Sequence, residues 1–348
     1  MSESGDYEPA AHWKGYDFNS ARAAYKDVID RSYDDAVAKK VSVVDCVPET
    51  LETDSEAPLV IACDITGSMD KWPQTIFSKL PYLEHEGKEY LGEGMQIAFC
   101  AIGDVFSDKY PVQVRPFVSG IGLKESLEKL IIEGGGGGSS QESYDMMALY
   151  LSEHCKMPQA IRKPIMIFIG DEGVYSYVDN SHAKTWARTD LKDKVTPESV
   201  FEKLKEKFSV YIVRKPYQCN SNNPGTAEKR IQEQWCALLG ADHVVSLPSA
   251  DRVVDVIFGI LAKETDRVDY FEKELKDRQL PDKDGDDKVS VVLKSLHSIH
   301  KIGKDASLKK IDGPKGGRAK SISKKVGGAK SISLLDDDDA DADKDPLS

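Results

Sequence analysis

The sequence predicts an α/β protein built on a doubly wound, mostly parallel β-sheet. From residue 59 onward, short apolar runs rich in β-branched residues alternate with longer segments of helical periodicity. This alternation is typical of βαβ units, in which helices cover both faces of a parallel sheet. The chain has 348 residues, of which 40% are hydrophobic, an ordinary fraction for a globular protein with polar ends.

The predicted strands are apolar runs that end in turn residues: Leu59–Cys63, Met95–Ile102, Ile165–Ile169, Val210–Val213 and His243–Ser246. The segment Val112–Phe117 is expected to add an antiparallel strand at the edge of the sheet. The predicted helices repeat their apolar residues with the period of a helix. They are Trp72–Leu83, Gly122–Ile131, Ser143–His154, Pro197–Lys207, Ala227–Leu239 and Ser249–Glu264.

Helical extensions are expected before and after this α/β region, and a polar tail follows them. Helical periodicity predicts helices at Tyr16–Ala38, Asp266–Leu280 and Val289–Ile302. After Gly303 the composition shifts to Gly, Lys and Ser, with the pentapeptide AKSIS twice, and then to an acidic run. So few apolar residues predict disorder. The tail is interpreted as either a solubilising end or a set of docking sites. The expected division is an N-terminal helical extension (1–57), an α/β domain (58–265), a C-terminal helical extension (266–303) and a disordered tail (304–348).

Charge and cysteine content limit the partners and the compartment. The net charge of −12 argues against nucleic acid as a partner, because a nucleic-acid binder shows a basic face. No apolar stretch approaches the roughly 20 residues that span a bilayer, so no membrane role is expected. The polar, acidic N-terminus does not resemble a secretory signal. The six cysteines form no CxxC pair and are expected to be buried, reduced thiols of a cytoplasmic protein.

Oxygen-bearing side chains follow the first predicted strand of the domain. The run from Leu59 to Cys63 ends at Asp64, and hydroxyls follow at Thr66 and Ser68. One carboxylate and two hydroxyls on such a turn suit a small, hard cation that prefers oxygen ligands. This turn is therefore a candidate site for Mg²⁺ or Mn²⁺.

Further loops of the same kind are expected at the same edge of the sheet, because the carboxyl ends of parallel strands meet there. A glycine-rich loop, Gly134–Ser143, precedes a predicted helix and offers oxygen ligands. The strand Ile165–Ile169 ends in Gly170, Asp171 and Glu172, and Asp171 is the candidate ligand. Asp104 follows another strand. It is expected either to stabilise a turn or to support the metal ligands without contacting the metal. The candidates in the glycine-rich loop are Ser140, Glu142 and Ser143.

In this order, the three loops resemble the metal-ion-dependent adhesion site (MIDAS) of von Willebrand factor type A (vWA) domains. The family motif Asp-x-Ser-x-Ser is matched by Asp64-Ile65-Thr66-Gly67-Ser68, in which Thr66 keeps the hydroxyl group. The similarity covers about residues 58–264. The family's second loop usually supplies a threonine, which this chain lacks. Some intracellular members carry Gly-Gly-Gly-Asp-x-Pro-Glu there, and residues 135–142 are similar without the proline. Which of Ser140, Glu142 and Ser143 replaces the threonine stays open.

The resemblance implies a non-enzymatic protein-interaction module. In that family the first-loop hydroxyls, here Thr66 and Ser68, contact the metal directly. The carboxylates corresponding to Asp64 and Asp171 often act through water, and an acidic side chain of the protein partner completes the coordination. An ion with few direct negative ligands stays electrophilic enough to bind an external carboxylate.

Two other functions remain as alternatives. A metal-free structural scaffold is permitted by the unusual second loop. A phosphoryl-transfer enzyme of the haloacid-dehalogenase type also begins with an aspartate at a strand end. There, however, a second acid normally transfers the proton, and Thr66 occupies that position here. Arg214 and Lys215 follow another strand and are interpreted as solvated charges or as groups that attract an acidic partner.

Overall fold

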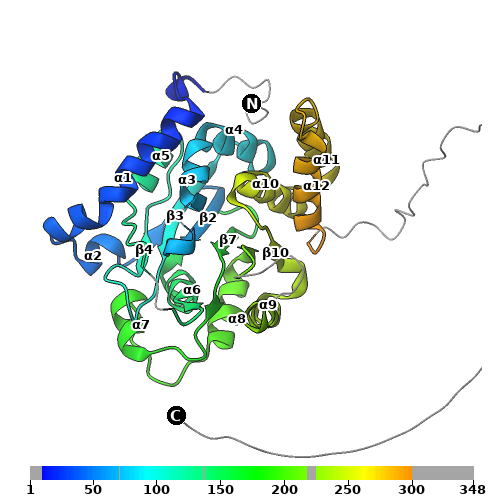
Figure 1. The fold of residues 1–348 in the computed structure, drawn as a ribbon. Helices are drawn as coiled ribbons and strands as arrows, with labels where there is room; N and C mark the ends of the chain where they lie inside the picture. Colours follow the sequence, from blue (N-terminus) through cyan, green and yellow to red (C-terminus); the bar gives the residue numbers. More distant parts are fainter. Residues whose placement is uncertain (1–9, 70, 136–137, 218–224, 300–348) are drawn as a thin grey trace, which may run out of the picture. The chain divides into compact units, whose positions relative to one another are not determined.

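The centre of the molecule is a six-stranded sheet with the strand order β10-β9-β7-β2-β3-β4 (Figure 1). A computed structural model describes residues 10–69, 71–135, 138–217 and 225–299. Five strands are parallel, and β4 (Val112–Val114) pairs antiparallel with β3 at the edge. The predicted α/β class and the antiparallel edge strand are confirmed. The parallel strands are β2 (Ala57–Asp64), β3 (Met95–Ile102), β7 (Ile165–Gly170), β9 (Ser209–Arg214) and β10 (Val244–Ser246).

Strand β2 divides the hydrophobic core between the two faces of the sheet. Its residues Leu59, Ile61 and Cys63 belong to one buried cluster, whereas Val60 and Ala62 belong to another. Side chains of a strand alternate between faces, so both faces are buried beneath other elements. All eight residues of β2 are buried, which explains why its sequence is a continuous apolar run.

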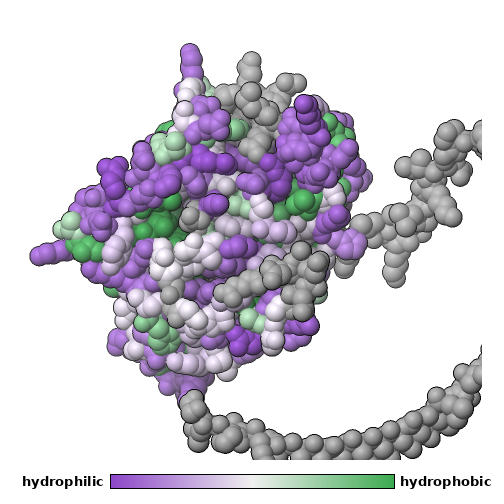
Figure 2. All heavy atoms as spheres, in the orientation of Figure 1, coloured by the Kyte–Doolittle hydropathy of each residue, from purple (hydrophilic) through white to green (hydrophobic). Residues whose placement is uncertain are grey.

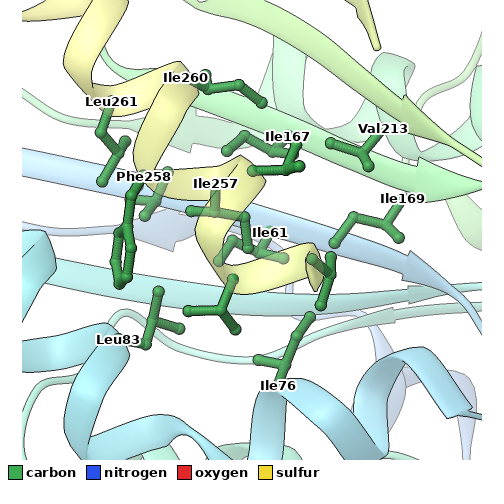
Figure 3. Close-up of a cluster of buried hydrophobic side chains, with 14 of the residues drawn as sticks. Ile61, Ile76, Leu83, Ile167, Ile169, Val213, Ile257, Phe258, Ile260 and Leu261 are labelled. Carbon is green, nitrogen blue, oxygen red and sulfur yellow. The ribbon is translucent and has the colours of Figure 1, made fainter. Parts of the chain in front are cut away.

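One cluster lies under helices from both halves of the chain. Figure 3 shows Ile257, Phe258, Ile260 and Leu261 of one helix packing toward sheet residues such as Ile167. The helices contributing to this first face are α1 (Phe18–Ala38), α3 (Lys71–Ser78), α4 (Leu80–Leu91), α5 (Gly122–Glu128), α10 (Val253–Glu264), α11 (Val268–Gln279) and α12 (Gly285–Leu296).

The other cluster is covered by a different group of helices and is rich in aromatic rings. Trp235 meets Phe201 edge-on, with ring centroids 5.6 Å apart, and also contacts Phe168 of the sheet. The helices on this second face are α2 (Val43–Cys46), α6 (Tyr144–His154), α7 (Asn180–Trp186), α8 (Pro197–Lys207) and α9 (Thr226–Leu239).

Short elements complete the described fold. Two small parallel pairs join β1 (Leu51–Glu52) to β6 (Cys155–Lys156) and β5 (Gln141–Glu142) to β8 (Gly173–Val174). Single 3₁₀ turns are η1 (Ala11–Trp13), η2 (Gly67–Met69), η3 (Ala241–His243) and η4 (Ala250–Arg252).

The N-terminal helical extension packs against the α/β region through aromatic side chains. Tyr25 of α1 is fully buried and stacks on Phe77 of α3, with ring centroids 4.3 Å apart. Trp13 is also buried, and its indole N–H donates to Glu84 Oε2 at 2.6 Å. The same carboxylate accepts a hydrogen bond from Gly120 N through Oε1. Glu84 therefore joins the N-terminal segment to two other parts of the fold.

The C-terminal helices are attached through a buried ionic network. Asp255 of α10 pairs with Arg278 of α11 at 3.0 Å and with Arg252 at 3.3 Å. Gly259 lets α12 approach α10 closely, because a side chain at this position would overlap Leu296. The described residues, which lie between 10 and 299, belong to one compact unit. The predicted tail, 304–348, lies outside the described residues.

The predicted helix Trp72–Leu83 is wrong in its extent. The structure has two helices there, α3 and α4, separated at Lys79. Pro81 lies in the first turn of α4, where its missing N–H costs nothing because that group has no intrahelical acceptor. The sequence did not reveal this break, because the apolar residues keep the period of a helix across it. The short helix α7 was not predicted.

The described cysteines agree with the prediction of reduced thiols. Cys46, Cys63, Cys100, Cys155 and Cys236 are free, and all but Cys236 are buried. Cys219 lies outside the described residues. Among the helices that the structure describes, none has the length and apolarity needed to cross a membrane.

Strands β2 and β7 end at a topological switch point of the sheet. The chain leaves β2 toward α3 on the first face, and it leaves β7 toward α8 on the second face. Neighbouring parallel strands whose connections go to opposite faces create the crevice in which α/β proteins bind ligands. Asp64 ends β2, and Asp171 follows β7.

Candidate metal centre

The first loop is ordered by hydrogen bonds to the Asp64 carboxylate. Asp64 Oδ1 accepts the Thr66 hydroxyl at 2.6 Å and the Thr66 N–H at 2.9 Å. Asp64 and Thr66 are both buried. Because the hydroxyl of Thr66 donates its proton to Asp64, both of its lone pairs remain for another electrophile.

The third loop holds the other hydroxyl of the first loop. Ser68 Oγ donates to Asp171 Oδ2 at 2.7 Å. The second oxygen of Asp171, Oδ1, is buried without a hydrogen-bond partner in the part of the chain that the structure describes. The structure therefore joins two of the predicted loops side chain to side chain.

Lys215 is a cation at this junction. Its ammonium group donates to the Ser68 carbonyl at 2.7 Å and to Asp171 Oδ2 at 3.2 Å. Its neighbour Arg214 is fully buried and pairs through both terminal nitrogens with Glu228. The interpretation of Arg214 as a solvated or partner-attracting charge is wrong, because Glu228 on α9 neutralises it inside the protein.

In the second loop, Glu142 faces the other carboxylates. Its side chain is fully buried, neither carboxylate oxygen accepts a hydrogen bond from an N–H or hydroxyl group of the described residues, and the Glu172 carboxyl group lies beside it. Burial, the Asp64 carboxylate and the neighbouring Glu172 raise the pKa of Glu142 well above its usual value. Glu142 belongs to β5, which pairs with β8 directly after Asp171 and Glu172.

The two serines of the second loop have other partners. Ser140 Oγ donates to the Ser139 carbonyl at 2.6 Å and accepts from Arg230 at 2.8 Å. Ser143 Oγ accepts from Val105 N at 2.9 Å. Within the described residues, no hydrogen bond joins either hydroxyl to the first or third loop.

Main-chain contacts connect the first loop to the glycine-rich loop. Gly67 N donates to the Gly135 carbonyl at 3.0 Å. A Cβ at Gly67 would lie 3.0 Å from the Gly134 carbonyl oxygen, closer than side chains normally come. The two loops can approach this closely because neither carries a side chain at the contact.

Tyr144 is a site residue that the sequence analysis missed. Its hydroxyl donates to Asp64 Oδ2 at 3.0 Å. A Cβ at Gly170 would overlap that hydroxyl, so Gly170 makes room for Tyr144. The glycine directly before Asp171 is the sequence signal that a bulky group approaches the strand end.

Asp104 stabilises a turn. Its carboxylate accepts from Phe106 N at 3.0 Å, from the Ser107 hydroxyl at 3.0 Å and from the Tyr175 hydroxyl at 2.8 Å. These bonds occupy both oxygens, which agrees with the turn-stabilising role.

The carboxylates of the assembled site repel one another. Burial and the nearby Asp171 carboxylate raise the pKa of Asp64, against the hydrogen bonds from Thr66 that lower it. Burial also raises the pKa of Glu172, and Asp171 adds to that effect. Carboxylates are gathered here, and the Glu142 oxygens and Asp171 Oδ1 have no donor among the described residues, a cost that a divalent cation would relieve.

The donor set of the candidate centre is mixed. Among the described residues, no group of three or more His, Cys, Asp or Glu side chains is placed to hold a metal ion. The candidate centre depends on hydroxyl oxygens as well as carboxylates. Oxygen-only ligands fit Mg²⁺ and Mn²⁺ chemically.

Comparisons with known proteins add little. No family model and no curated protein matches the sequence. Among solved structures, the chain is similar to the pilus adhesin SpaC from Lactobacillus rhamnosus GG, with 12% identity and a TM-score of 0.42, over 65% of this chain and 32% of the adhesin. It is also similar to proximal thread matrix protein 1 from the mussel byssus, with 13% identity and a TM-score of 0.39, over 61% of this chain and 48% of that protein.

The chain thus spans between a third and a half of the length of these two structures. Similarities with TM-scores this low carry no argument about the function of this protein.

Proposed function

We propose that this protein is a metal-dependent protein-interaction module, a doubly wound vWA-type domain with a MIDAS. In this proposal the site binds Mg²⁺ or Mn²⁺, and the ion binds a carboxylate of a protein partner. The observation that carries the proposal is a set of buried oxygens from three loops, including Glu142 and Asp171 oxygens that lack hydrogen-bond donors among the described residues.

The two hydroxyls are the proposed direct ligands. Thr66 and Ser68 each donate their proton to a carboxylate, Asp64 and Asp171 respectively. A carboxylate that accepts this proton leaves the lone pairs of the hydroxyl oxygen for the metal. Tyr144 and the Thr66 N–H fix the orientation of Asp64 in turn.

Glu142 is the proposed contributor from the second loop. The hydroxyls of Ser140 and Ser143 already have partners away from Asp64. The Glu142 carboxylate is buried beside the other acids and has no donor among the described residues. In this proposal, a bound cation supplies the missing charge compensation for the buried carboxylate.

Lys215 contributes to the charge balance of the proposed site. A divalent ion surrounded by several carboxylates has little attraction left for an external anion. The Lys215 ammonium lies 3.2 Å from Asp171 Oδ2 and offsets part of that carboxylate's charge. The ion then retains more of its attraction for a partner carboxylate.

Free thiols at the described cysteines support the further proposal that the protein is cytoplasmic.

Isothermal titration calorimetry with Mg²⁺ and Mn²⁺ tests the metal site. Thr66→Val removes a ligand hydroxyl but keeps the shape of the side chain, so we expect at least a tenfold loss of affinity, about the size seen for disturbed metal ligands. Thr75→Val is the matched control, because Thr75 is an equally buried threonine whose hydroxyl bonds within α3. Absence of binding to the wild type, or equal binding by Asp64→Ala, would refute the proposal.

Lys215 also favours a second candidate function, a metal-free scaffold. Its ammonium already binds Asp171 and the Ser68 carbonyl, as an internal cation would. The two candidates differ in their response to Lys215→Met. Removal of a competing positive charge should raise the Mg²⁺ affinity of a true metal site, by about tenfold for a charge at this range.

In a scaffold, Lys215→Met instead leaves Asp171 without its counter-ion and lowers the melting temperature. Mg²⁺ would then neither bind nor restore the loss. Thermal unfolding with and without Mg²⁺ distinguishes the two results.

A further inference from the structure

We propose that the aromatic patch, formed by Phe106, Tyr175, Tyr177 and His182, binds an apolar side chain of the same partner segment that presents the carboxylate. This proposal rests on the proposed metal-dependent function and adds the chemistry of the partner to it. The occupant is a protein segment with an aliphatic or aromatic residue close to its acidic residue.

The patch is a contiguous set of rings with two exposed members. Phe106 contacts Tyr175 and His182 edge-on, with centroids 4.8 Å and 4.7 Å apart, and lies 6.5 Å from Tyr177. The side chains of Phe106 and Tyr177 are 49% and 53% exposed. They are the aromatic members of the exposed large hydrophobic residues in the described chain.

Exposed apolar side chains are otherwise dispersed. Figure 2 shows a mainly hydrophilic face on which hydrophobic residues form small, separate patches. A single exposed apolar residue needs no explanation, whereas adjoining aromatic rings are the composition that marks the centres of protein interfaces.

Tyr175 connects the patch to the candidate metal centre. Its ring packs on Phe106, and its hydroxyl donates to Asp104 and lies 3.4 Å from Ser139 Oγ in the glycine-rich loop. Tyr175 directly follows Val174, which pairs with Glu142 between β5 and β8. The patch therefore borders the glycine-rich loop that contributes to the candidate metal centre.

The turn that carries Phe106 is held in place. Asp104 accepts from Phe106 N and from the Ser107 hydroxyl, while Asp108 accepts from Asp104 N at 2.7 Å. Val105 N donates to Ser143 at the start of α6. An exposed ring on a turn with this many bonds is presented in a fixed position, which reduces the entropy cost of binding.

The chemistry of the patch favours an apolar occupant over a basic one. Two acids that contact this region are hydrogen-bonded within the protein: Asp104 accepts from the Tyr175 hydroxyl, and Asp179 accepts from the Ser181 hydroxyl and His182 N. Their oxygens are therefore directed at donors of this chain, and the exposed rings supply apolar surface. A partner side chain that covers Phe106 and Tyr177 would remove their faces from water.

The test uses a phage-displayed library of random peptides with one fixed central aspartate, selected on the full chain in Mg²⁺ and eluted with EDTA. We expect the enriched peptides to carry an aliphatic or aromatic residue at one preferred distance from the aspartate. Fluorescence anisotropy with one such peptide should show about tenfold or greater loss of affinity for Phe106→Ala, the size typical of a central interface residue. Ile161→Ala is the matched control, because Ile161 is an apolar residue, 66% exposed, that precedes the start of β7, whereas Asp171 follows the end of that strand.

Several outcomes would overturn the proposal that the patch binds an apolar side chain. They are enriched peptides without an apolar preference, a basic residue at the preferred position, no enriched peptide at all, or equal peptide affinity of Phe106→Ala and wild type. A parallel loss of Mg²⁺ affinity in Phe106→Ala would also count against the patch, because the variant would then act through the metal centre.

Calorimetry of Mg²⁺ with the wild type separates the two proposals. If Mg²⁺ binds and the peptide results fail, only the proposed role of the patch is wrong. If Mg²⁺ does not bind, the proposed function fails with it.

Discussion

The Ser68 hydroxyl donates a hydrogen bond to Asp171 Oδ2 at 2.7 Å across 103 positions of sequence. This contact joins the turn after β2 to the turn after β7, at the edge of the sheet where those neighbouring strands end. It orients a hydroxyl oxygen and a carboxylate toward one another without help from the second loop. The predictions below test this arrangement and the fold that supports it.

Ser68→Ala should weaken Mg²⁺ binding by about tenfold or more, because it removes a proposed ligand and the donor that orients Asp171. Calorimetry measures the effect. The matched control is Ser78→Ala, which removes a hydroxyl that bonds within the same region of the chain, to the Thr75 carbonyl. Equal losses in both variants would mean that Ser68 has no special relation to the metal.

Glu142→Gln should raise the melting temperature without metal and should reduce the stability that Mg²⁺ adds. In EDTA, the neutral amide avoids the cost of burying a carboxyl group among other acids, so the melting temperature should rise by about 2–4 °C for each kcal/mol gained. In Mg²⁺, the variant should gain less stability from the ion than the wild type does, because a proposed ligand charge is lost.

The control for Glu142→Gln is Glu228→Gln, which weakens the buried pair with Arg214 and should lower stability in both solutions. A Glu142→Gln variant that is destabilised in EDTA, with an unchanged response to Mg²⁺, would contradict the assigned role.

Gly170→Ala should destabilise the fold by about 1–3 kcal/mol or more, because the new methyl group would overlap the Tyr144 hydroxyl. Urea unfolding measures the change. In the double variant with Tyr144→Phe, the loss should be smaller than the sum of the single losses, since the clash is partly relieved. Gly225→Ala is the control, because a Cβ there meets no atom of the described residues within 4 Å. Strict additivity would argue against the overlap.

Glu84→Gln should reduce stability by about 1–3 kcal/mol at neutral pH, because a charged acceptor for several hydrogen bonds is lost. Burial tends to raise the pKa of Glu84, but the hydrogen bonds from His12, Trp13 and Gly120 outweigh it and lower the pKa below its usual value. A depressed folded-state pKa stabilises the protein above the unfolded-state pKa, and this contribution disappears as the pH falls through the folded value.

The stability gap between wild type and Glu84→Gln should therefore be constant near neutrality and narrow below about pH 4.5, the ordinary glutamate pKa. Chemical unfolding at a series of pH values measures the gap. Glu49→Gln, at an exposed glutamate, should change stability little at any pH. A gap that widens in acid would show that the charge of Glu84 is not what stabilises the N-terminal segment.

The sheet was predictable because its strands are buried on both faces. Each parallel strand then reads as an unbroken apolar run, as Leu59–Cys63 does, and the polar residue that ends the run marks the edge where ligands bind. Asp64, Thr66 and Ser68 could be selected on this local pattern alone, and their hydroxyl and carboxylate chemistry needed no distant partner to be recognised.

The rest of the site depends on contacts that no local pattern encodes. Arg214 and Lys215 are adjacent basic residues, yet one is buried against Glu228 and the other reaches Asp171. Tyr144 reads as the start of an amphipathic helix, and its bond to Asp64 spans 80 positions. Alternation along β9 and the position of α9 decide these outcomes, and both are properties of the assembled fold.

The hydrogen bond from Gly67 N to the Gly135 carbonyl joins the first loop to the glycine-rich loop through main-chain atoms alone. A link made only of main-chain atoms survives replacement of every side chain around it. Exposed side chains near the contact, such as Ser139 and Phe106, are therefore open to combinatorial exchange in a display library, with the loops still in register. This protein could serve as a scaffold for selecting new metal-assisted binders, in which the glycines are kept constant and the surrounding positions are varied.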